Sequence, residues 1–145
     1  MVKFITNMKT NSKYREGILV ESMVHYLKEK GYFVKENVPN LNRCADIAAI
    51  NQKGEIIVFE CKINDYKKAI QQLKTHRLCA DHVYIVTFHK KISIRILNEI
   101  NENGIGLIFI DNKGNIDYKE FCSNIFINKW NKGQELLKKY IKEVA

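Results

Sequence analysis

Several common sequence signals are missing from this chain, and each absence removes a class of protein. It has no run of 18 apolar residues and no signal peptide, so we expect a cytoplasmic protein with no membrane-spanning segment. The four cysteines form no CxxC pair and have no histidine at zinc spacing, which favours reduced structural thiols over a zinc site. We find one proline and no internal repeat, glycine-rich phosphate loop or low-complexity linker.

The composition is that of a single basic domain. A chain of 145 residues with 46% hydrophobic composition can bury a proper core, and we expect residues 1–145 to form one domain. Its 24 basic and 16 acidic residues give a net charge of +8, which favours an anionic partner, most commonly nucleic acid. The alternative is a basic protein whose charges are simply solvated.

Residues 43–62 predict a β-hairpin that carries the chemistry. The strands RCADIAAIN and EIIVFECK flank the turn QKG, in which Gly54 takes the left-handed position. This register places Asp46 opposite Glu60, and opposed residues share a face with Cβ atoms roughly 4.5–5.5 Å apart. Since like charges so placed repel, we expect Lys62 on the same face, or a bound divalent cation, to offset them.

The second strand of the hairpin is apolar on both faces, which is typical of a central strand. Charges at the end of such a strand line a cleft more readily than a convex surface. The alternative is an exposed hairpin end with ordinary surface charges. Cys61 points away from Glu60 along the strand, so a catalytic thiol is a weak hypothesis.

Two helices flank this hairpin in the sequence. The first is predicted over residues 13–30, capped by Ser12 and ended by Gly31, with a buried stripe of Val20, Met23, Val24 and Leu27. Glu21 falls at the margin of the stripe and could lean over the site, although a solvated glutamate is the default.

The second helix is predicted over residues 66–80 with Asp65 as its cap. Its buried stripe is Tyr66, Ala69, Ile70 and Leu73, surrounded by the basic residues Lys67, Lys68, Lys74, His76 and Arg77. Gln71 and Gln72 lie off the stripe and are surface residues by default.

Further strands and helices complete the chain. We expect strands at 32–38, 82–88 and 105–110, a loop at 40–43 opened by Pro39, and a basic loop at 89–91. Helices are expected at 93–103 and from about residue 129, a turn at 111–114, and no clear state for 115–127. Helix-separated strands imply parallel pairing.

The order helix, three strands, helix, strand, with Asp46 on the second strand and Glu60-Cys61-Lys62 on the third, resembles the PD-(D/E)XK nuclease superfamily over residues 12–112. The spacing from Gly17 to Glu21, then RCAD, then FECK, looks most like archaeal Holliday junction resolvases and related small nucleases. AIQQL at 69–73 is similar to the AxxQL helix of many members, which selects Gln72 over Gln71. Ala45 departs from the proline of the name-giving motif.

The resemblance implies an α/β fold with a restriction-endonuclease-like αβββαβ core, a central mixed sheet flanked by helices, an additional αβ unit and a C-terminal helix. It implies a Mg²⁺-dependent (or Mn²⁺-dependent) DNA endonuclease, with branched or Holliday-junction DNA as one substrate and a homodimer as the assembly. Asp46 and Glu60, with the Cys61 carbonyl, would hold one or two ions, and Glu21 would add a ligand. Lys62 would act on the attacking water and the phosphate, and Gln72 would hydrogen-bond near the site.

Basic residues near the hairpin are the candidates for DNA contacts. They are Lys13, Arg43, Lys67, Lys68, Lys74, Arg77, Lys90 and Lys91. Two other functions stay open: a catalytically silent nucleic-acid-binding module, and a subunit that joins a helicase or a repair or restriction partner through the lysine-rich terminal helix. The intact Asp46, Glu60 and Lys62 set argues against a silent module.

Overall fold

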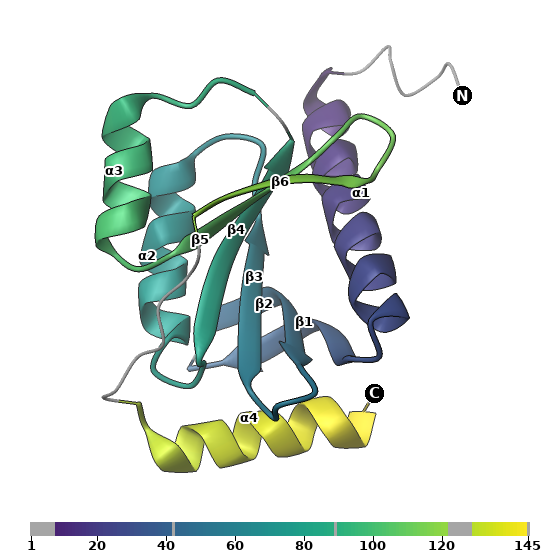
Figure 1. Cartoon of the computed structure of the whole chain (residues 1–145), viewed down its shortest axis with the longest axis vertical. Coiled ribbons are helices and arrows are strands. Elements are labelled where there is room, and N and C mark those ends of the chain that lie inside the picture. Colours follow the sequence, from purple (N-terminus) through teal and green to yellow (C-terminus); the bar gives the residue numbers. More distant parts are fainter. Residues whose placement is uncertain (1–7, 42, 89, 122–128, 145) are drawn as a thin grey trace.

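Six strands form one mixed sheet, in the order β1-β2-β3-β4-β5-β6, with helices on both faces (Figure 1). The computed structural model describes residues 8–41, 43–88, 90–121 and 129–144, with only the backbone described for residues 8–13, 117–121 and 144. The strands are β1 (Phe33–Asn40), β2 (Arg43–Ile50), β3 (Ile56–Cys61), β4 (His82–Phe88), β5 (Gly106–Ile110) and β6 (Ile116–Phe121). The helices are α1 (Met8–Glu29), α2 (Tyr66–His76), α3 (Ile94–Glu102) and α4 (Asn131–Val144).

The strand directions follow the expectation from the sequence. β1, β2 and β3 form an antiparallel meander, β3, β4 and β5 are parallel, and β6 returns antiparallel to β5. Parallel neighbours need a crossover, and α2 and α3 supply the two crossovers. The expected α/β class with a mixed sheet flanked by helices is therefore confirmed. In the described part of the chain, no helix is both long and apolar enough to cross a membrane.

The hairpin of β2 and β3 has the predicted register. The turn closes with hydrogen bonds from Asn51 N to the Glu55 carbonyl and from Gly54 N to the Asn51 carbonyl, both 3.0 Å long. Gly54 has φ +82°, a left-handed conformation that glycine adopts without a steric penalty. Every residue of β3 is buried, as expected for a central strand.

Helices cover both faces of the sheet (Figure 1), and each face has its own cluster of buried apolar side chains. On one face α1 buries Leu19, Met23, Val24 and Leu27 and contacts β1, β2, β3, β4 and β6, and Gly31, at φ +83°, follows its end. On the other face lie α2 and α3. Side chains along a strand alternate between faces, so Ile56 and Val58 of β3 pack on the α2 side while Ile57 and Phe59 pack on the α1 side.

Two predicted boundaries were wrong near the start of the chain. The first helix begins at Met8 instead of Lys13, so Ser12 lies within the helix and does not cap it. Pro39 does not open a long loop, because β1 continues through Pro39 and Asn40 and pairs with the start of β2. Since β1 is an edge strand, it has no neighbouring strand on one side, and a proline without an N–H is tolerated there.

The second helix also differs from its prediction. It ends at His76 instead of Ala80. Asp65 precedes the helix, but it has φ 56° and its side chain makes no capping hydrogen bond. In contrast, Ser93 caps α3 as predicted, since its hydroxyl accepts a hydrogen bond of 3.3 Å from Ile96 N. The undecided segment after Gly114 contains β6.

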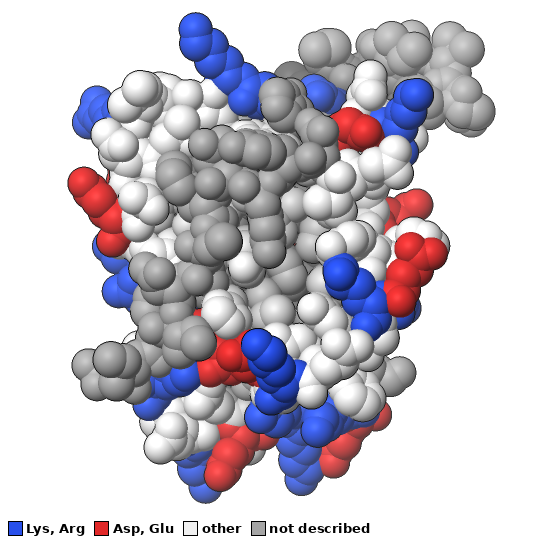
Figure 2. All heavy atoms as spheres, viewed as in Figure 1, with Lys and Arg blue, Asp and Glu red and all other residues white. Residues whose placement is uncertain are grey.

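The C-terminal helix α4 lies across the end of the sheet where the β2–β3 turn is found (Figure 1). It buries Leu137 and Ile141 in the cluster on the α2 side and contacts β1 and β2. Lys and Arg side chains gather at this end of the face in Figure 2, interleaved with Asp and Glu. Lys139, for example, lies 3.9 Å from Glu143, so the charge of the helix is partly neutralised.

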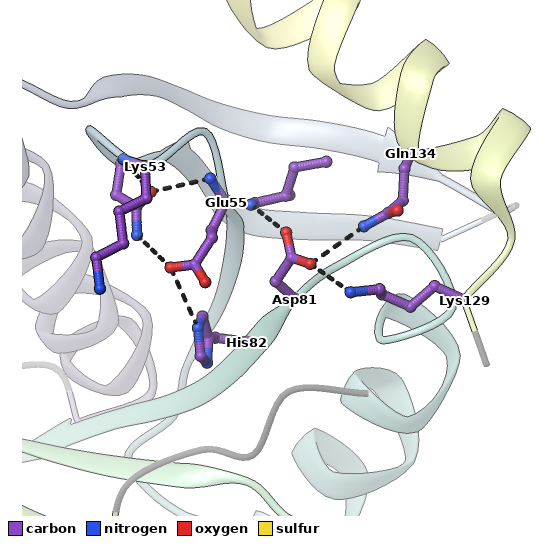
Figure 3. A network of polar contacts seen from close by, with 8 residues as sticks. Lys53, Glu55, Asp81, His82, Lys129 and Gln134 are labelled. Atoms are coloured by element: carbon purple, nitrogen blue, oxygen red, sulfur yellow. Dashed lines mark hydrogen bonds and ion pairs between the residues drawn. The ribbon is translucent and has the colours of Figure 1, made fainter. Parts of the chain in front are cut away.

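A polar network attaches this end of the chain to the sheet (Figure 3). The carboxylate of Asp81 accepts hydrogen bonds from Ile56 N at 2.8 Å, from Lys129 Nζ and from Gln134 Nε2 at 3.5 Å. Burial raises the pKa of Asp81, but these hydrogen bonds, led by that of Lys129, lower it overall. Asp81 therefore acts as a structural anchor between β3 and α4.

Candidate active site

Two carboxylates meet where β2 and β3 separate. The regular ladder between these strands ends at the pair Ile47 and Phe59, one position before Asp46 and Glu60. Side chains then replace the ladder bonds: Cys61 N donates to Asp46 Oδ2 at 2.8 Å, and Asp46 N lies 3.4 Å from Glu60 Oε2. Each carboxylate thus accepts from the backbone of the opposite strand, and the expected juxtaposition of the pair is observed.

Glu60 is almost fully buried, with 1% of its surface exposed. Burial, and then the nearby charge of Asp46, raise its pKa from 4.5 to about 8. The positive charge of Lys62, two residues on and half-buried, acts in the opposite direction. Glu60 therefore retains a proton at neutral pH unless a further positive charge approaches the pair.

His76 lies on the other side of Glu60, in the last position of α2. Its side chain is 0% exposed, so the prediction that it is one of the basic residues around the buried stripe was wrong. It follows Leu73 by three residues and so continues the buried face of the helix. Burial, and then the charge of Arg43, lower its pKa from 6.5 to about 4, although the nearby backbone of Cys44 acts in the opposite direction. The ring is therefore neutral at pH 7.

The imidazole of His76 connects β1 with the carboxylate pair. Its Nδ1 lies 3.0 Å from Asn40 Nδ2, and both side chains are buried. Its Nε2 lies 3.6 Å from Glu60 Oε2, which is beyond hydrogen-bond length. With the Asn40 amide donating to Nδ1, the neutral ring carries its proton on Nε2, facing Glu60.

Gln72 lies one helical turn before His76, on the same face of α2. Gln72 is half-buried and Gln71 is exposed, which agrees with the selection of Gln72 over Gln71 from the similarity to the AxxQL helix. Among the side-chain atoms described, Gln72 Oε1 and His76 Nε2 are buried and have no hydrogen-bond partner. An oxygen acceptor and an N–H donor are thus presented from neighbouring turns of one helix.

The structure does not bring Glu21 to the carboxylate pair. Glu21 is exposed on α1, and that helix packs against the sheet face opposite to α2. Glu16, about one and a half turns earlier on α1, lies near enough to Cys61, the residue after Glu60, for its charge to raise the pKa of that thiol. Within the described residues, no group of three or more His, Cys, Asp and Glu side chains is arranged to hold a metal ion.

Cys61 has the environment of a structural thiol. It is buried in the apolar cluster on the α1 side, away from Glu60. Burial, followed by the charges of Asp46, Glu60 and Glu16, raises its pKa well above the ordinary value of 9.0. A thiol that stays protonated is a poor nucleophile, as expected from the sequence. Its carbonyl as a metal ligand remains a prediction.

Some of the basic candidates for DNA contacts are exposed, and others are held by hydrogen bonds within the protein. Arg43, Lys67, Lys68 and Lys91 are exposed. Lys90 is exposed too, but its Nζ donates to the Ile63 carbonyl at 3.0 Å and so holds the loop after β3.

The remaining basic candidates are less accessible or lie outside the described set. Lys74 and Arg77 are half-buried, and Arg77 donates to the Asn103 carbonyl at 3.3 Å. The side chain of Lys13 and all of His89 lie outside the described residues, as does Cys122. Arg77 is therefore at least partly a structural contact between α2 and the end of α3.

Comparisons with known proteins give the fold a solved counterpart. No protein-family model and no curated protein matches the chain. A solved structure of the SPO1766 protein of unknown function from Silicibacter pomeroyi is similar, with a TM-score of 0.66 and 18% sequence identity over 88% of this chain and 83% of that chain. At this identity the likeness concerns the fold alone.

Proposed function

We propose that this chain is a divalent-metal-dependent endodeoxyribonuclease of the PD-(D/E)XK type. The element order α1-β1-β2-β3-α2-β4 is the order expected from the resemblance, which supports the proposal. The observation that carries the proposal is the pair of Asp46 and Glu60 at the point where β2 leaves β3, with Lys62 beside it. Two ionised carboxylates so close together would repel each other, and a bound cation would offset that repulsion.

The donor chemistry of the site fits a hard divalent cation. Mg²⁺ and Mn²⁺ prefer carboxylate and carbonyl oxygens, and Asp46 and Glu60 would be the two protein ligands. Gln72 Oε1, buried and without a partner among the described atoms, is a further oxygen of the right kind on the α2 side. Mg²⁺ commonly binds through one or two carboxylates and retains several waters, so a third acidic ligand is not required.

Each residue of the site would have a separate role in phosphodiester hydrolysis. The bound cation would supply a more acidic water and neutralise charge on the attacked phosphate. Asp46 and Glu60 would hold that cation, and in doing so Glu60 would give up the proton that burial otherwise keeps on it. Lys62 would orient the attacking water and contact the scissile phosphate. Arg43, Lys67, Lys68 and Lys91, exposed on the surrounding elements, would bind the DNA backbone.

Cleavage assays test the proposal directly. Supercoiled plasmid, linear duplex and a four-way junction are each incubated with the protein, with Mg²⁺, Mn²⁺ or EDTA. We expect metal-dependent cleavage of at least one substrate. Asp46→Asn should lower cleavage by orders of magnitude, because the cation loses a ligand, while DNA binding in EDTA stays equal or improves. Lys62→Ala should also abolish cleavage and weaken binding modestly.

Two matched variants control for the loss of a charge. Glu36→Gln removes a carboxylate from the exposed side of β1, and Lys53→Ala removes an exposed lysine from the β2–β3 turn. Both should cleave like wild type. If Asp46→Asn and Lys62→Ala also cleave like wild type, the nuclease activity belongs to a contaminant.

The second candidate function is a nucleic-acid-binding module without catalysis. The exposed position of Glu21 favours it, because a ligand expected from the resemblance is missing from the site. Metal-independent DNA binding with no cleavage of any of the three substrates would select this alternative.

A further inference from the structure

The buried pair of Asn40 and His76 has no role in the function described above. A buried histidine beside an apolar cluster is costly unless its two ring nitrogens have partners. Asn40 supplies a partner for Nδ1 at 3.0 Å, whereas Nε2 has none among the described atoms and faces Glu60 Oε2 at 3.6 Å. The donor is thus aimed at the carboxylate that the proposed reaction uses.

We propose that His76, fixed by Asn40, is a positioning residue that holds the Glu60 carboxylate in the orientation in which it binds the divalent cation. This inference rests on the proposed function of the site. Asn40 lies at the end of β1, His76 at the end of α2 and Glu60 near the end of β3. The Asn40–His76–Glu60 contacts therefore connect three elements that are separate in the sequence.

Because the Asn40 amide donates to Nδ1, the ring presents an N–H at Nε2, which suits this task better than the side chain of a lysine or an arginine would. A lysine or arginine at the same place would neutralise Glu60 and compete with the cation for it. The imidazole N–H faces the carboxylate at 3.6 Å, orients it by electrostatic attraction and leaves its negative charge to the cation. Outer groups that orient metal ligands typically contribute about 10–100-fold in metal affinity.

Substitutions at His76 separate positioning from packing. His76→Gln retains an N–H group at about the place of Nε2, whereas His76→Leu fills the space without a donor. Asn40→Ala leaves the ring in place and removes the group that fixes Nδ1. Leu73→Ala, one turn earlier on the same buried face, is the matched control for damage to the core.

The measurement is Mn²⁺ binding to the DNA-free protein, followed by electron paramagnetic resonance at a temperature where each variant is folded. We expect the Mn²⁺ dissociation constant to rise about 10–100-fold in His76→Leu, to rise less in Asn40→Ala, and to stay near wild type in His76→Gln and Leu73→Ala. The Mg²⁺ concentration for half-maximal cleavage should rise in the same order, while the rate at saturating Mg²⁺ changes less.

Three outcomes decide the matter. Wild-type Mn²⁺ affinity in both His76→Leu and Asn40→Ala would overturn the inference and leave the proposed function intact. An equal loss of affinity in Leu73→Ala would also overturn it, since packing alone would then explain the effect. If the wild-type protein neither binds Mn²⁺ nor cleaves DNA, the proposed function is wrong and the inference fails with it. If His76→Leu does not fold, Asn40→Ala and His76→Gln give the same decision.

Discussion

Replacing Glu60 with glutamine should abolish a distinctive pH dependence of stability in the metal-free protein. Burial raises the pKa of Glu60 from 4.5 to about 8, so the folded protein keeps a proton that the unfolded chain releases. The stabilisation by this protonated carboxyl is complete below about pH 4.5 and is lost as the pH rises towards 8. Glu60→Gln keeps the shape of the side chain and removes the titration.

His76 acts in the opposite direction over part of this range. Its pKa is lowered from 6.5 to about 4, so its contribution to stability grows as the pH rises from 4 to 6.5. The two groups therefore offset one another below pH 6.5, and Glu60 dominates above it. At a limiting slope of about 1.4 kcal/mol per pH unit, which weakens near pH 8 as Glu60 itself titrates, the free energy of unfolding should fall by roughly 1–2 kcal/mol between pH 6.5 and 8.

Urea unfolding in EDTA at pH 6.5, 7.0, 7.5 and 8.0 measures this slope. Wild type and the control Glu36→Gln, which alters an exposed carboxylate, should both lose stability, whereas Glu60→Gln should be nearly flat. Mg²⁺ should restore wild-type stability most at pH 8, because it binds the ionised pair. Equal unfolding free energies at pH 6.5 and 8 in the wild type would show that Glu60 is not held in its protonated form.

Three further predictions concern other parts of the molecule. Asp81→Ala should lower the free energy of unfolding at pH 7 by about 1–3 kcal/mol in urea titrations, since it leaves a buried backbone N–H and a lysine without their acceptor. Because the pKa of Asp81 is lowered, the wild type should lose this contribution as the pH falls below the ordinary value of 3.8. An alkylating reagent should label exposed Cys44 in the native protein and leave buried Cys61 unlabelled, as peptide mass spectrometry can check, and rapid labelling of Cys61 would contradict its raised pKa. Replacing both Lys67 and Lys68 with alanine should weaken DNA binding and reduce its salt slope by about 0.9 per lost phosphate contact, whereas an unchanged slope would place the DNA elsewhere.

Local sequence rules predicted the hairpin and much of the sheet. The turn with Gly54 sets the register of the two strands. This register places Asp46 opposite Glu60, and the two side chains lie on the same face because side chains along a strand alternate between faces with a period of two residues. The apolar run of β3 likewise predicted a central strand. His76 could have been recognised by the same reasoning, since it lies three residues after Leu73 on the buried face of its helix.

Tertiary packing, and not helical periodicity, determines which helix residues reach the carboxylate pair. Periodicity gives the angle of Glu21 around its helix, but the face of the sheet that α1 covers and its rotation upon that face determine whether Glu21 reaches the site. The structure leaves Glu21 in solvent and brings Asn40, 36 residues before His76, to the imidazole ring. Contacts of this kind depend on packing between elements that are distant in the chain, here β1, β3 and α2.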